Sequence, residues 1–139
     1  MYLVDTNVIS EVRKQARADK GVLRFFRRAA QDDAGLYLSV VTVGELRRGV
    51  EIIRHRGDQP QATRLENWLD GVLREFASNI LAVDAEIGQL WGRLRVPRPE
   101  HSLDKLIAAT ALIHDLTVVT RNVGDFTGTG ARVLNPFNE

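Results

Sequence analysis

The chain of 139 residues contains no cysteine. It therefore has no disulfide, no thiolate nucleophile and no cysteine-ligated zinc, and the lack of thiols fits a reducing compartment. No apolar run approaches the roughly 20 residues that a membrane-spanning helix needs. The apolar opening breaks at Asp5, so no signal segment is expected. We expect a cytoplasmic protein without a membrane partner.

The chain also lacks a strong excess of either charge. Nineteen Lys and Arg residues face 18 Asp and Glu residues, a formal net charge of +1, so total charge does not point to nucleic acid. Several arginines are clustered in the sequence, at 27–28, 47–48 and 54–56. Arginine suits phosphate recognition because its planar fork donates two hydrogen bonds, but solvated helix faces would show the same clusters.

Short apolar segments alternate with longer segments of helical periodicity. The apolar segments predict strands at 2–4, 36–40, 80–83, 116–120 and 131–134. Helices are predicted over about 6–13, 19–32, 42–56 and 60–77, after a cap at Asp84 and after a cap at Ser102, with loops at 57–60 and 96–99. This alternation indicates an α/β protein with a mainly parallel central sheet of about five strands flanked by helices. The length suits a single domain over 1–139.

Polar residues that can bind a cation lie at or just past the ends of these predicted strands. In open parallel sheets, ligands bind beyond the carboxyl ends of the strands. One of the candidates, Asp104, reaches that edge only if its helix begins there, which the sequence alone leaves open. The candidates are Asp5, Glu45, Asp104, Asn122 and Asp125.

Carboxylates gathered in one cleft raise one another's pKa unless a cation neutralises them. A set of oxygen ligands without cysteine suits Mg²⁺ or Mn²⁺. Such an ion can hold a phosphate and activate water, so hydrolysis of a phosphodiester is the natural reaction.

Each acid also has a purely structural interpretation. Thr42 and Glu45 fit a capping box at a helix start. Asp104 would be favoured by the dipole of its helix. Asp125 can form a turn, and Asp5 can end a strand, with Thr6 or Asn7 capping the next helix.

Four stretches together resemble PIN-domain proteins of the VapC and FitB type, the toxins of bacterial toxin–antitoxin pairs. They are YLVDTNVIS (2–10), LSVVTVGELRRGV (38–50), LDKLIAATALIHDLTVVTRNVGDF (103–126) and NP (135–136). The resemblance covers essentially the whole chain. It implies a three-layer PIN-like fold over 1–139 and an endoribonuclease that depends on Mg²⁺ or Mn²⁺.

The resemblance also assigns roles to the acids. Asp5, Glu45 and Asp104 match the three principal acids of the motif. Asp5 and Asp104 would bind the metal, and Glu45 would complete the ligand set and orient the attacking water. Some relatives carry an acid where this chain has Asn122, which offers only a carbonyl oxygen. We expect Asp125 to supply the missing charge; if it does not, a second metal becomes doubtful.

Further residues are expected around these acids. Asn7 and Thr120 would orient Asp5 and its neighbouring loop. Three arginines near the motif acids are candidates for contacts with RNA phosphates: Arg47, Arg48 and Arg121. The three histidines do not form a metal-ligand spacing, and we expect them in loops or on the surface: His55, His101 and His114.

The family resemblance implies three partners besides RNA: a cognate antitoxin that blocks the acidic cleft, operator DNA bound only through that antitoxin, and a second copy of the chain in a homodimer. The alternative is a non-catalytic partner-binding module on the same fold, which the departure at Asn122 favours. A haloacid-dehalogenase-like phosphohydrolase would need a second Asp two residues after Asp5, and that position holds Asn7.

Overall fold

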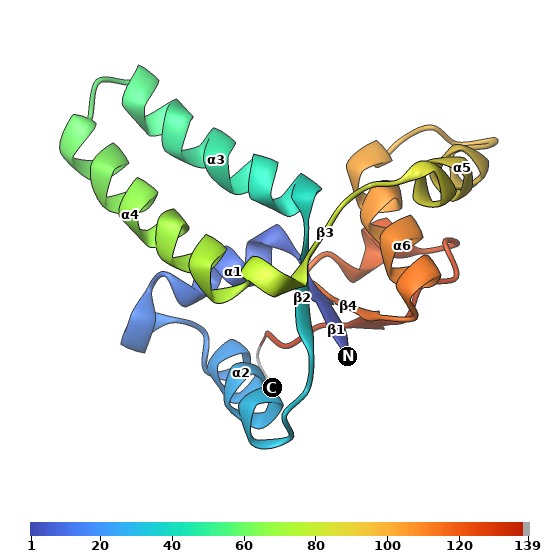
Figure 1. The fold of residues 1–139 in the computed structure, drawn as a ribbon, viewed down its shortest axis with the longest axis horizontal. Coiled ribbons are helices and arrows are strands. Elements are labelled where there is room, and N and C mark those ends of the chain that lie inside the picture. Colours follow the sequence, from blue (N-terminus) through green and yellow to red (C-terminus); the bar gives the residue numbers. More distant parts are fainter. Residues whose placement is uncertain (138–139) are drawn as a thin grey trace.

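The computed structural model describes residues 1–137. Its centre is a five-stranded sheet with the order β3–β2–β1–β4–β5, and every adjacent pair is parallel (Figure 1). The predicted parallel sheet of about five strands is therefore confirmed. The strands are β1 (Tyr2–Val4), β2 (Leu36–Ser39), β3 (Ile80–Leu81), β4 (Thr117–Val119) and β5 (Val133–Leu134).

Within residues 1–137, six α-helices and three short 3-10 helices connect and flank the strands. The α-helices are α1 (Thr6–Val12), α2 (Lys20–Gln31), α3 (Val40–His55), α4 (Gln59–Glu75), α5 (Ala85–Leu94) and α6 (Ser102–His114). The 3-10 helices are η1 (Gln15–Arg17), η2 (Ala77–Asn79) and η3 (Val123–Phe126). No α-helix within residues 1–137 is long and apolar enough to cross a membrane.

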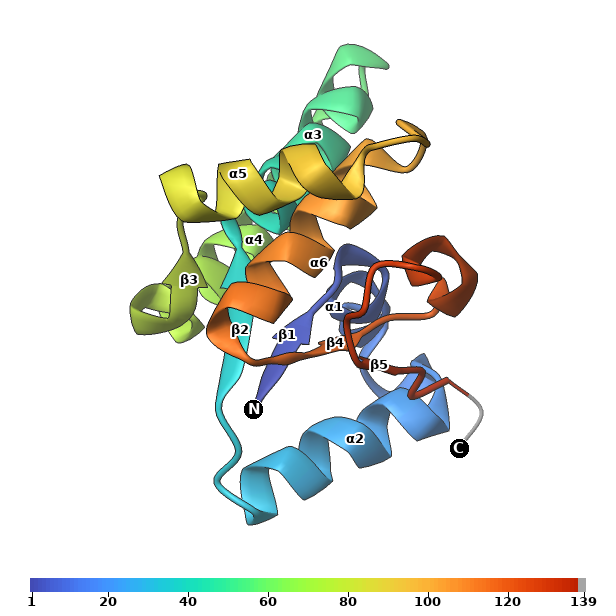
Figure 2. The same ribbon diagram turned by 90° about the vertical axis from the view of Figure 1, so that its right-hand side faces the viewer.

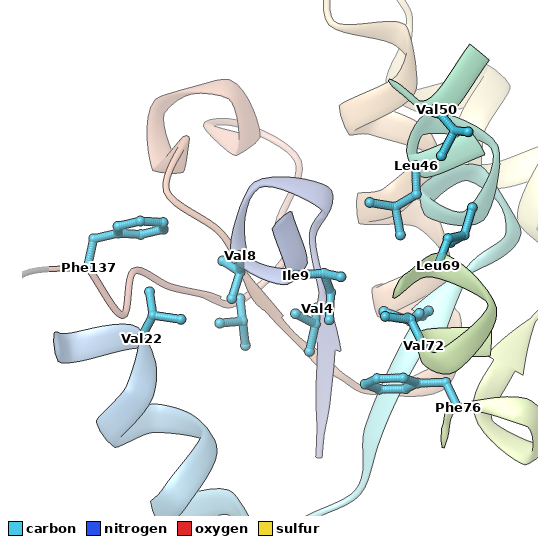
Figure 3. Close-up of a cluster of buried hydrophobic side chains, with 12 residues drawn as sticks. Val4, Val8, Ile9, Val22, Leu46, Val50, Leu69, Val72, Phe76 and Phe137 are labelled. Atoms are coloured by element: carbon cyan, nitrogen blue, oxygen red, sulfur yellow. The ribbon is translucent and has the colours of Figure 1, made fainter. Parts of the chain in front are cut away.

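One face of the sheet is covered by α1 to α4. Val4 of β1 packs there with side chains from all four helices, which Figure 3 shows pointing toward one another. The α3–α4 pair forms the long helical hairpin of Figure 1. The cluster includes Val8, Ile9, Val22, Leu46, Val50, Leu69, Val72 and Phe76.

The opposite face is covered by α6, with α5 packed on α6 (Figure 2). Leu3 and Val118 contribute to this second cluster, whereas their strand neighbours Val4 and Val119 belong to the first. Successive strand side chains point to opposite faces, so such apolar runs fill two cores at once. The result is three layers, helix–sheet–helix.

The connections leave the centre of the sheet in opposite directions. From β1 the chain runs through α1 and α2 to β2 on one side, whereas β4 leads to β5 on the other. Adjacent strands whose connections diverge in this way leave a crevice at their carboxyl ends. The carboxyl ends of β1 and β4 are thus where the fold favours a site.

Several element boundaries differ from the sequence-based predictions because of helix caps. The Ser39 hydroxyl accepts the Val41 N–H at 3.0 Å, so α3 begins at Val40, two residues early. Asp84 caps α5 as predicted, by accepting the Ile87 N–H at 3.0 Å. The third and fifth strands keep only two residues each, fewer than expected.

Two predicted caps are wrong. The residue that caps α1 is Asp5, whose Oδ1 accepts the Thr6 N–H at 2.8 Å, rather than Thr6 or Asn7. Helix α6 is preceded by His101 in a left-handed conformation, φ 55°, with no side-chain cap. Ser102 is the first residue of that helix, since the left-handed turn immediately before it sets where the helix begins.

Candidate metal centre

Asp5 lies at the carboxyl end of β1 and is 5% exposed. Its N–H donates to the Val119 carbonyl at 2.9 Å, which continues the β1–β4 pairing. Its Oδ1 accepts the Thr6 N–H and its Oδ2 accepts the Thr120 hydroxyl, both at 2.8 Å. Burial raises the pKa of Asp5, and these two hydrogen bonds oppose that rise. The carboxylate is fixed in orientation at the diverging connection.

Asn7 and Thr120 surround Asp5 as expected from their positions. The Asn7 amide donates to the Thr120 hydroxyl at 3.3 Å and lies 3.5 Å from Asp5 Oδ2. The side-chain Oδ1 of Asn7 accepts the backbone N–H of Arg121 at 3.1 Å. The hydroxyl oxygen of Thr120 accepts the backbone N–H of Asn122, also at 3.1 Å. These bonds tie the start of α1 to the loop after β4.

Glu45 lies in the second turn of α3 with an exposed side chain. Its Oε1 accepts the Thr6 hydroxyl at 2.8 Å, which brings it to the start of α1 beside Asp5. Because Ser39 caps α3, Glu45 is too far along the helix to form a capping box with Thr42. The capping-box interpretation is therefore wrong.

Asp104 lies in the first turn of α6. Burial and the nearby negative charges of Asp5, Asp125 and Glu45 raise its pKa to about 6, although His101 opposes the rise. The start of α6 therefore faces the same edge as the strand ends.

Asp125 lies in η3 and is partly exposed. Its negative charge raises the pKa of both Asp5 and Asp104, so it belongs to the same acidic group. Asn122 precedes η3 and contributes its backbone N–H to Thr120. The structure thus gathers four acids, with Asp125 as the fourth.

His101 joins this group, although we expected it only as a loop or surface residue. Its Nδ1 lies 3.8 Å from Asp104 Oδ2 and 3.7 Å from Asp125 Oδ1. One possible ligand atom from each of the three residues lies within 4.8 Å of the others. The expected exposure of His101 is correct, but its spacing of three residues from Asp104 was the overlooked signal.

The three candidate arginines differ in their surroundings. Arg47 pairs with Glu66 of α4 at 2.6 Å and with Glu51 at 3.5 Å. The guanidinium of Arg121 lies 4.7 Å from the centre of the Phe137 ring. Arg48 is exposed on α3. The Arg47 charge is therefore shared with two carboxylates of the α3–α4 hairpin.

The donor set fits a divalent cation. Carboxylate oxygens dominate it, which suits Mg²⁺ or Mn²⁺. Burial raises the pKa of Asp104 most, and the negative charges of Asp5, Asp125 and Glu45 raise it further. A cation among these acids would reduce their repulsion, and His101, Asp104 and Asp125 each offer a ligand atom within 4.8 Å of the other two.

Comparisons with known proteins agree with this geometry. The family model described as PIN domain matches residues 2–127. Toxin FitB of Neisseria gonorrhoeae is 34% identical, with all of both chains covered. VapC ribonuclease Y4jK of Sinorhizobium fredii is also 34% identical, covering 99% of this chain and 98% of the relative.

Solved structures also contain chains of similar fold. The crystal structure of FitAcB from Neisseria gonorrhoeae contains a chain with a TM-score of 0.85 and 33% identity, and both chains are covered completely. A structure of FitAB bound to an IR36 DNA fragment contains one with a TM-score of 0.84 and 31% identity, covering 100% of this chain and 97% of that one. The chain therefore belongs to the PIN-domain family, where it is similar to toxins of the FitB and VapC type.

Proposed function

We propose that this protein is a metal-dependent endoribonuclease that acts as the toxin of a toxin–antitoxin pair. The observation that carries the proposal is the convergence of acids at one edge of the sheet. The Thr120 hydroxyl donates to Asp5 at the end of β1, and His101 lies 3.8 Å from Asp104 and 3.7 Å from Asp125. Similarity to a protein named VapC ribonuclease supports the choice of RNA as substrate.

In this proposal Asp5 and Asp104 hold the metal, and Asp125 supplies the fourth acid. The metal, when bound, would stabilise negative charge on the phosphate and favour ionisation of water. Glu45, fixed by the Thr6 hydroxyl, would orient the attacking water. Thr120 and Asn7 hold Asp5 in place, while Asn122 acts through its backbone.

Substrate binding would fall to the exposed arginines. Arg48 and Arg121 are free of carboxylate partners within the described residues, so either can meet an RNA phosphate. Arg47 would first have to give up Glu66. We therefore rank Arg48 and Arg121 above Arg47.

The proposed partners follow from the relatives. A cognate antitoxin would cover the acidic residues and hold the enzyme inactive, and the DNA-bound FitAB structure supports operator binding through the antitoxin. We also propose a cytoplasmic homodimer in which residues 1–139 form one PIN domain.

The test is cleavage of RNA by the purified protein with Mg²⁺ or Mn²⁺. Asp104→Asn and Asp5→Asn should each lose roughly 100-fold or more of the activity, since charge stabilisation of a transition state is commonly worth this much. Asp115→Asn is a matched control at the other end of α6, where Asp115 pairs with Arg132. Full cleavage by both site variants would contradict the proposal.

A non-catalytic partner-binding module remains the second candidate, favoured by Asn122 at a position where some relatives carry an acid. It predicts no binding of Mn²⁺ that depends on the four acids. Calorimetric titration of the wild type and Asp104→Asn with Mn²⁺ separates the two candidates.

A further inference from the structure

His101 faces two acids of the proposed metal centre without bonding to either. The distances from its Nδ1 to Asp104 Oδ2 and Asp125 Oδ1 are 3.8 and 3.7 Å. Both exceed the length of a hydrogen bond. The ring nitrogen thus lies near both carboxylates, and in the neutral imidazole it could bind a cation that displaces its proton.

The separations are compatible with a shared ion. Two ligands that each lie about 2.1 Å from one ion can be at most about 4.2 Å apart. Both separations of the His101 nitrogen fall below this limit. The three ligand atoms lie within 4.8 Å of one another, so a small movement of the side chains toward each other would let all three bind one ion.

The backbone around His101 is held by contacts from both sides. Its carbonyl accepts the Lys105 N–H at 2.9 Å, which starts α6. The Lys105 ammonium, nearly buried, donates to the Arg98 carbonyl and ties down the preceding loop. The Trp91 indole of α5 donates to the Ser102 carbonyl at 2.8 Å. These bonds fix the backbone that carries the imidazole, although the ring itself is exposed.

We propose that His101 is a nitrogen ligand of the metal of the proposed site, beside Asp104 and Asp125, and that it makes this site prefer Mn²⁺ to Mg²⁺. The inference rests on the proposed function, because it concerns the same metal. Mg²⁺ demands near-ideal octahedral oxygen ligands and keeps several waters, whereas Mn²⁺ is a first-row transition metal, so a nitrogen ligand should favour Mn²⁺ over Mg²⁺.

The test is pulsed electron paramagnetic resonance of the protein loaded with Mn²⁺. A directly bound imidazole produces nitrogen modulation of the Mn²⁺ echo. The wild type should show this modulation, and His101→Gln should lose it while still binding Mn²⁺ through the acids. His114→Gln, a control at the far end of the same helix, should keep it.

Calorimetry supplies the second measurement. His101→Gln should reduce the preference for Mn²⁺ over Mg²⁺ by about tenfold, comparable with the loss of a residue that supports a metal ligand. Mn²⁺ bound by the wild type without nitrogen modulation would overturn the role of His101 and leave the proposed nuclease intact. Absence of any Mn²⁺ binding that depends on Asp104 would overturn both.

Discussion

At the scale of single residues, the site consists of acidic side chains that the fold keeps close together although their negative charges repel one another. Asp104 shows this most clearly, because burial and three neighbouring acids raise its pKa to about 6. A residue selected for stability alone would not be placed there. The unfavourable placement becomes useful when a cation is present.

This arrangement gives the metal-free protein a specific pH dependence. Between an unfolded pKa of 3.8 and a folded pKa of about 6, the folded state binds more protons at Asp104 than the unfolded state does. The contribution of Asp104 to stability therefore falls as pH rises through this window, and the full penalty is present above it.

Replacing Asp104 with Asn should consequently stabilise the metal-free protein at pH 8. After a discount for solvent screening, we expect a gain of about 1 kcal/mol, or roughly 2–4 °C in the melting temperature. The gain should vanish near pH 4. Thermal melts in a chelator at both pH values check this, and a lower melting temperature for the variant at pH 8 would contradict it.

Thr120 gives a second prediction for a single residue. Thr120→Val keeps the shape of this buried side chain but removes the hydrogen bond to Asp5 Oδ2. Loss of a group that orients a metal ligand commonly costs about 10- to 100-fold in affinity. We expect that loss in a Mn²⁺ titration. Unchanged affinity would show that the hydroxyl does not position Asp5.

At the scale of elements, helix ends decide where the acids lie. Glu45 reaches Thr6 because Ser39 starts α3 directly at the end of β2. Asp104 reaches the same edge because α6 begins immediately after the left-handed His101. Caps and entry turns therefore position the site as much as the strands do.

The two serines at helix starts test this account of the caps. Ser39→Ala removes the hydrogen bond to the Val41 N–H and should cost about 1 kcal/mol of folding free energy. Ser102→Ala removes no cap and should change stability by less than about 0.5 kcal/mol. Denaturant melts of both variants are the measurement. Equal losses would contradict the assignment of the caps.

Some of these elements followed from the sequence and others did not. The apolar runs near Leu3 and Val118 predicted buried parallel strands, because period-2 burial on two faces leaves a continuous apolar signal. The cap of α6 was misplaced at Ser102 instead of His101, since a left-handed histidine has no sequence signature comparable to that of a serine cap.

At the scale of the whole molecule, one topological feature gathers the site. The connections of β1 and β4 diverge, so residues far apart in the sequence meet at their carboxyl ends, as the Thr120–Asp5 hydrogen bond shows. The placement of Asp5 could be predicted from a strand followed by an acid. The place of His101 could not, because it depends on how α5 and α6 pack on each other.

Of the two candidate residues after β4, Asp125 and not Asn122 lies near the other acids. Both follow β4, and spacing alone does not choose between them. The turn of η3 carries Asp125 back to His101, while Asn122 turns its backbone N–H to Thr120. The packing of the loop therefore favours Asp125 in the proposed site, a choice that the motif left open.

The central claim is that Asp5, Glu45, Asp104 and Asp125 form one cation site. Its most direct test is a calorimetric titration with Mn²⁺ at pH 8 of the wild type, Asp104→Asn and the control Asp115→Asn. The account predicts binding by the wild type and the control, and a loss of about 100-fold or more in Asp104→Asn, because a charged inner ligand contributes more than the groups that orient it. Equal binding by all three proteins would contradict it.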